Sequence, residues 1–188
     1  MSLVVVVLLI ALLIGWAAGG AVGRLGGLPL NAPQLVVAAL LVQLVGAVAG
    51  GPVHPVGLVV SALLVLAFLA RNRRLRGTGL VATGLLLNAV VIGANGAMPV
   101  SADAAARAGL ALEDLVADAR HEPADEATRV RLLGDVVPVL LPRRPEVVSP
   151  GDVLLSAGLG QLVVAGMLTR GRQALPERVR LDRGSVQP

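Results

Sequence analysis

Long apolar segments without a single charge recur along this chain, and they constrain its fold more than any other feature. A helix needs roughly 20 apolar residues to cross the hydrocarbon core of a bilayer, within a range of about 17–25. Segments of this kind lie at residues 3–22, 35–49, 56–70, 80–94 and 153–169. The pattern predicts an all-α membrane protein, a bundle of about five transmembrane helices with a small extracytoplasmic cap between the fourth and fifth.

The second and third segments are short, and a run of glycine and proline at 50–55 separates them. We expect residues 35–70 to form a tight helical hairpin; a re-entrant pair that never fully crosses is the alternative. The first segment follows only Met1 and Ser2, and it is longer than the apolar core of a cleaved signal peptide, which spans about 7–15 residues. We therefore expect it to be retained as a span.

The arginines predict the orientation of these spans. Arg24 follows the first span, a cluster at residues 71–76 follows the third, and a third group at residues 170–183 follows the fifth. Cytoplasmic loops carry an excess of arginine and lysine. With five spans, this rule places the N-terminus and residues 96–150 outside and the C-terminus in the cytoplasm. The cytoplasmic regions then hold ten arginines and two acidic residues, a net charge of +8, whereas residues 96–152 have a net charge of −4.

The predicted organisation has four parts. Residues 1–95 form a four-helix transmembrane region, residues 96–150 the cap, residues 151–170 the fifth transmembrane helix, and residues 171–188 an arginine-rich cytoplasmic tail. Within the cap, Ser101 is typical of the residue that caps a helix, here 102–108 with Gly109 at its end. We expect a helical turn near 112–116, a short helix over 124–133, and extended pieces at 136–141 and 147–148. A segment of this size is too small for a core of its own, so it should rest on the bundle.

Small residues predict how the helices pack. Gly15, Gly19 and Gly23 recur every four residues, a spacing that lets two helix backbones approach closely in a membrane. Gly46 with Gly50, and Ser156 with Gly160, repeat the spacing. Packing within the bundle is the first interpretation, and docking onto a partner membrane protein is the second.

Asn88 and Asn95 lie seven residues apart, on one face of the fourth helix. A buried amide needs a partner inside a membrane, so this face should point into the bundle. The expected partners are Gln43, Ser61 and Gln161. No ionisable residue lies in the middle of a span, which argues against a proton relay or an ion pathway.

Five residues of the outer region are candidates for catalysis: Asn95, Ser101, His121, Asp135 and Asp152. His121 is a candidate general base, oriented by Asp135 or Asp152, with Ser101 or a water as nucleophile. The same residues suit a metal ion, but the chain has no zinc-protease, serine-hydrolase or phosphate-loop motif. Structural roles explain each residue more simply: Ser101 and Asp152 as helix caps, Asn95 as a helix stop, Asp135 in a turn and His121 in a solvated loop. We therefore predict no metal site.

Three stretches carry a resemblance: Asn88 to Ser101, Leu133 to Pro138, and Val148 to Leu155. Together they resemble the bacterial membrane-protein family catalogued as domain of unknown function fifty-three seventeen (DUF5317). The resemblance covers most of the chain. It implies a multi-span membrane protein with a shared outer motif set, and no reaction.

Composition removes several classes of function. The chain has no cysteine and only two aromatic residues, so it lacks thiolate chemistry and the stacking surface of a single-strand nucleic-acid groove. We expect no cofactor and no nucleic acid. The expected partners are membrane lipids and another membrane protein. The leading hypothesis is an accessory or scaffolding subunit of a complex in the bacterial cytoplasmic membrane, rather than an enzyme. An extracytoplasmic enzyme acting on a lipid or envelope substrate, and a lipid or small-molecule carrier, are the alternatives.

Overall fold

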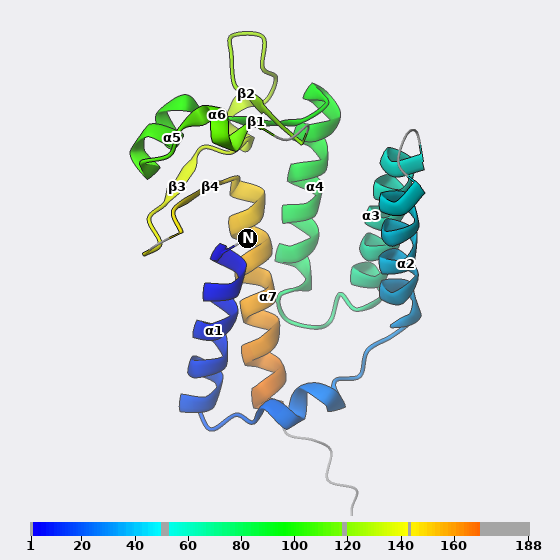
Figure 1. The fold of residues 1–188 in the computed structure, drawn as a ribbon. Coiled ribbons are helices and arrows are strands. Elements are labelled where there is room, and N and C mark those ends of the chain that lie inside the picture. The colour runs from blue at the N-terminus through cyan, green and yellow to red at the C-terminus, as the bar shows by residue number, and fades with distance from the viewer. Residues whose placement is uncertain (1, 50–52, 118–119, 143, 170–188) are drawn as a thin grey trace, which may run out of the picture.

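The computed structural model describes residues 2–49, 53–117, 120–142 and 144–169. Five apolar helices dominate it: α1 (Ser2–Ala17), α2 (Gln34–Ala49), α3 (Val53–Arg71), α4 (Thr78–Asn95) and α7 (Pro150–Leu168). Successive helices run in opposite directions, and α7 packs between α1 and α4 (Figure 1). Within the described residues, α4 and α7 are long and apolar enough to cross a membrane, whereas α1, α2 and the Val56–Arg71 part of α3 are apolar but shorter.

The first helix is shorter than its apolar segment, which predicted a span to Val22. It ends at Ala17, and Gly19 then adopts a left-handed conformation with φ of 78°. The chain continues into the 3-10 helix η1 (Val22–Gly27), whose Arg24 donates a hydrogen bond of 3.1 Å to the carbonyl oxygen of Met167 on α7. The left-handed turn therefore redirects the chain under the end of α7.

Glycines allow α4 and α7 to meet at backbone distance. A Cβ added at Gly158 of α7 would lie 2.7 Å from both the carbonyl oxygen of Gly77 and the amide nitrogen of Val81. Closer to the cap, Gly84 of α4 and Gly151 of α7 face each other in the same way. Gly77 and Gly84 are seven residues apart, as are Gly151 and Gly158, so about two helical turns separate the two contacts. α4 and α7 thus form one closely packed unit.

The glycines predicted on the first helix behave differently from one another. Gly15 packs on Met167, and a Cβ there would lie 3.0 Å from the Cε of that methionine. Gly19 and Gly23 lie beyond the end of α1, and a Cβ at either would meet nothing within 4 Å among the described residues. Of the three glycines predicted on the first helix, only Gly15 therefore makes a close helix contact among the described residues, whereas Gly160 of α7, from another predicted pair, packs on Val7 of α1.

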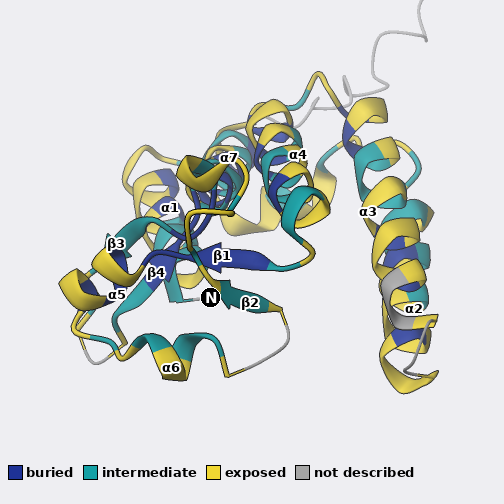
Figure 2. Cartoon of the chain, turned by 90° about the horizontal axis from the view of Figure 1, so that it is seen from above, coloured by how far each residue is buried: buried dark blue, intermediate teal, exposed yellow. Residues whose placement is uncertain are grey.

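The α2–α3 hairpin packs chiefly on itself. Gly46, near the end of α2, and Gly57, near the start of α3, face each other, and a Cβ at Gly57 would be 3.3 Å from the Cα of Gly46. Gly50, the other small residue predicted on the second helix, lies outside the described residues. At the base of the hairpin, the buried side chain of Asn72 binds the backbone of Asn31, accepting from its amide at 2.8 Å and donating to its carbonyl at 2.9 Å. The hairpin stands beside α4, as seen from above in Figure 2.

The cap lies over one end of α4 and α7 (Figure 1). It consists of β1 (Met98–Val100), α5 (Ala102–Ala108), α6 (Leu112–Leu115), β2 (His121–Pro123), η2 (Arg131–Leu133), β3 (Val137–Val139) and β4 (Glu146–Val148). β1 pairs in parallel with β2, and β3 pairs antiparallel with β4. A small core of alanines on one face of α5 packs against Val147. The cap also holds α1, because Glu146 accepts hydrogen bonds from the amides of Ser2 and Leu3.

The helix predicted over residues 124–133 is wrong. Asp125 instead closes a turn on itself, accepting from the amide of Ala127 at 2.9 Å, while its own amide donates to Thr128 Oγ1 at 2.8 Å. Aspartate and threonine side chains offer the backbone these local partners in place of helical ones. Val130 then takes a positive φ of 50°, and only η2 follows.

Candidate functional site

His121 and Asp135 meet inside the cap, although 14 positions separate them in the sequence. The parallel pairing of β1 and β2 places His121 opposite Met98, and Asp135 forms a bridge to Val100 on the same strand. The amide of Asp135 donates to the carbonyl oxygen of Pro99 at 2.8 Å, so its backbone is fixed. The His121 Nε2 atom lies 3.7 Å from Asp135 Oδ2. The prediction that His121 is a solvated loop residue is wrong, since it lies on a strand beside a buried carboxyl group.

The environment of Asp135 changes its acid–base behaviour. Burial and, to a smaller extent, the nearby charge of Asp152 together raise the pKa of this carboxyl to about 7, while His121 acts in the opposite direction. The side chain is only 8% exposed, whereas that of His121 is 32% exposed. A group with a pKa near neutrality, next to an accessible imidazole, is able to exchange protons at physiological pH. Asp135 is therefore not merely the turn residue that the sequence indicated.

Asp152 belongs to a second polar cluster, which joins the start of α7 to α4. Ser149 caps α7, accepting from the amide of Asp152 at 3.0 Å, while the Asp152 side chain accepts from the Ser149 amide. Asn88 of α4 completes the cluster: its amide donates to Asp152 Oδ1 at 2.8 Å, and its oxygen accepts from Ser149 Oγ at 2.9 Å. Asn88 is thus placed at the junction of cap and helices, and its partners are not Gln43, Ser61 or Gln161.

Asn95 and Ser101 have backbone partners. The Asn95 amide donates to the carbonyl oxygens of Val91 and Arg129, both at 2.9 Å, and its oxygen accepts from the Arg129 amide at 2.8 Å. It therefore fastens the loop before η2 to the end of α4. Ser101 caps α5, accepting from the amide of Ala104 at 3.3 Å. Both residues hold the cap in shape.

The five predicted catalytic residues therefore separate into three structural settings. His121 and Asp135 form a pair, Asp152 lies close enough to influence Asp135 but is bound to Asn88 and Ser149, and Asn95 and Ser101 are bound to backbone. Among the residues that the structure describes, no three histidines or acidic residues come together as a metal site. The sequence did not lead us to predict Ser149 as a partner of Asn88 and Asp152. The signal was present, since serine before Pro150 with Asp152 three residues later is the pattern of a capping box.

The model of a family of unknown function, DUF5317, matches residues 27–164, from the end of η1 to well inside α7. The chain belongs to the DUF5317 family. The matched region of this DUF5317 member contains His121, Asp135 and the whole Asn88 cluster. Neither the curated proteins nor the solved structures contain a match to the chain.

Proposed function

We propose that this DUF5317 member is a multi-pass protein of a bacterial cytoplasmic membrane and serves there as an accessory or scaffolding subunit. The proposal rests on the hydrogen bonds that its polar side chains make within the chain. Asn88, Ser149 and Asp152 join the cap to α4 and α7, while Asn95 and Ser101 fix the cap's own backbone. Three of the five candidate catalytic side chains, those of Asn95, Ser101 and Asp152, are therefore engaged in hydrogen bonds within the cap or between the cap and the helices.

The apolar exterior supports the membrane placement. Large aliphatic side chains are exposed along α1, α2 and α3, among them Leu13 at 64%, Leu44 at 61% and Leu63 at 60%. An apolar surface of this extent is not expected on a soluble monomer. The charges support the predicted orientation, because Arg24 and the arginines of the α3–α4 turn lie at the helix ends opposite the cap.

The α2–α3 hairpin is the part that we assign to partner binding. Its two helices pack on each other and turn apolar faces outward (Figure 2). Lipid provides no hydrophobic drive for association, so a partner helix would have to gain from close packing and hydrogen bonds. The exposed amide of Gln43 on α2 provides one such group.

Crosslinking in native membranes tests this role. A photoreactive amino acid at Leu44 or Leu63 should give one discrete protein adduct, and the same probe at Leu132, an exposed residue of the cap, is the matched control. We expect an adduct of constant mass from the two hairpin sites and none from the control. Adducts to lipid alone from both hairpin sites, together with purification as a lone protein, would contradict the scaffolding role.

An extracytoplasmic enzyme is the second candidate, and one observation favours it: the His121–Asp135 pair, with its carboxyl pKa near 7. Such a pair is suited to proton transfer during attack on a lipid or envelope substrate. Loss of cellular function in both His121→Ala and Asp135→Asn, at unchanged protein level and unchanged thermal stability, would support this candidate over the scaffold. Full function in both variants would exclude it.

A further inference from the structure

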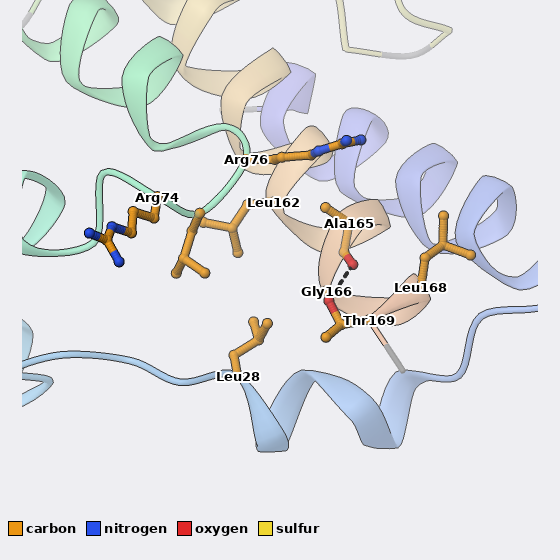
Figure 3. A pocket seen from close by; sticks show the side chains of 9 residues that line it. Leu28, Arg74, Arg76, Leu162, Ala165, Gly166, Leu168 and Thr169 are labelled. Carbon is orange, nitrogen blue, oxygen red and sulfur yellow. Dashed lines mark hydrogen bonds between the residues drawn. The ribbon is translucent and has the colours of Figure 1, made fainter. Parts of the chain in front are cut away.

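A pocket lies at the end of the molecule opposite the cap, between α7, the residues after η1 and the α3–α4 turn. It has a volume of about 340 Å³. Its walls are apolar and come from Leu28, after η1, and from Leu162, Ala165 and Leu168 on α7 (Figure 3). Arg74 and Arg76 of the α3–α4 turn complete the lining. The pocket therefore combines an apolar interior with two permanent positive charges.

The turn that carries these arginines is held firmly against α7. Gly77, with φ of 94°, touches the backbone of Gly158, a contact that no side chain would allow. The buried Thr78 donates to the carbonyl oxygen of Leu75 at 2.8 Å, and buried Asn72 holds the start of the turn. Arg74 and Arg76 thus project from a backbone whose position is fixed before any ligand arrives.

Arg24, at the same end of the molecule, has hydrogen-bond acceptors within the chain. It donates to the carbonyl oxygens of Met167 and Gly19. Arg74 and Arg76, in contrast, are exposed and have no hydrogen-bond acceptor among the residues that the structure describes. Arginine binds phosphate oxygens with paired, charge-assisted hydrogen bonds. A ligand that carries both a phosphate and acyl chains matches the two arginines and the apolar walls of this pocket.

We propose that this pocket binds an anionic phospholipid, with the phosphodiester at Arg74 or Arg76, whose guanidinium groups point to opposite sides of the pocket (Figure 3), and an acyl chain against Leu28, Leu162 and Leu168. In the proposed topology the arginines lie on the cytoplasmic side, where anionic headgroups attract basic residues near the surface. The inference rests on the proposed membrane placement, but it does not depend on a scaffolding role.

Native mass spectrometry of the purified, delipidated full chain in a neutral detergent tests the proposal. The probes are dioctanoyl-phosphatidylglycerol, dioctanoyl-phosphatidylcholine and glycerol phosphate. We expect one tight equivalent of the phosphatidylglycerol, weaker binding of the phosphatidylcholine and none of glycerol phosphate. Equal binding of both lipids would overturn the proposed role of the arginines. Glycerol phosphate bound as tightly as the anionic lipid would overturn the role of the acyl chain.

Two variants keep the test specific to this pocket. Arg74→Gln with Arg76→Gln should weaken phosphatidylglycerol binding about 10-fold or more, because the phosphate loses its charge-assisted hydrogen bonds to the arginines. The matched control is Arg71→Gln with Arg73→Gln, which removes the same charge from the same region without touching the lining. Ala165→Phe should weaken binding of both lipids by filling the pocket. Equal loss in the Arg74/Arg76 variant and in its control would reduce the effect to net charge and contradict a defined site.

Discussion

Gly158→Ala tests the close contact between α4 and α7. The added methyl carbon would lie 2.7 Å from two backbone atoms, the Gly77 oxygen and the Val81 nitrogen, and 2.8 Å from Val81 Cγ2. An ordinary van der Waals contact is about 3.5–4.0 Å, so the helices must separate by most of an ångström. Backbone atoms cannot rotate away as a side chain would. Overpacking of this kind costs typically about 1–3 kcal/mol.

The matched control is Gly93→Ala, which adds the same methyl group to α4 where nothing lies within 4 Å. Alanine is the better helix former by about 1 kcal/mol, so the control should be neutral or slightly stabilising. For a chain of this size, 1 kcal/mol corresponds to a shift in Tm of roughly 2–4 °C. The gain in helix propensity applies to both variants, so we expect Gly158→Ala to unfold at a temperature about 2–12 °C below that of Gly93→Ala in a fixed detergent, followed by circular dichroism. Equal Tm values for the two variants would refute the argument that this crossing depends on backbone contact.

Three further predictions concern the hairpin base, the cap and the junction. Asn72→Ala removes both hydrogen bonds to the backbone of Asn31, so it should lower the free energy of unfolding by about 2 kcal/mol and speed hydrogen exchange near residue 31. The control Asn31→Ala keeps those backbone bonds and should change neither quantity. Because burial raises the pKa of Asp135, the folded protein holds that proton more tightly than the unfolded chain, so the free energy of unfolding should fall as pH rises from 5 to 7. Asp135→Asn should flatten this dependence in pH-resolved thermal unfolding, and an unchanged slope would contradict the assignment. Ser149→Ala loses the cap of α7 and should lower stability by about 1 kcal/mol in the same assay, whereas an unaltered Tm would show that the capping box contributes nothing.

Apolar length and local capping rules predicted much of the fold. The α5 helix lies where Ser101 and Gly109 indicated, and the extended pieces after residue 136 pair as strands. Such features depend on residues close in sequence. The end of α1 was missed because an apolar segment does not show where a glycine such as Gly19 will adopt a positive φ. The false helix before Gly134 arose because helical spacing outweighed the turn chemistry of Asp125.

The candidate site was only partly predictable, since its geometry depends on long-range contacts. His121 and Asp135 were named on the basis of residue type, but they meet only because β2 pairs with β1 and Asp135 forms an isolated bridge to the same strand. The partners of Asn88 were missed because the sequence suggested amides within other spans. The structure instead places Asn88 beside the capping box of α7, where Gly151 leaves space for it. Asp152, one of the catalytic candidates, and Asn88, expected to pack within the bundle, thus join the start of α7 to α4.

The most direct test of this account is the sidedness of the two ends of the helices. The chain contains no cysteine, so single cysteines at Leu132 in the cap and at Arg73 in the α3–α4 turn report accessibility without background. Both positions are exposed. The account predicts that a membrane-impermeant maleimide labels Leu132→Cys in intact cells, and labels Arg73→Cys only after the membrane is opened. Labelling of both sites in intact cells, or of Arg73→Cys alone, would contradict a membrane protein with an outer cap and a cytoplasmic arginine turn.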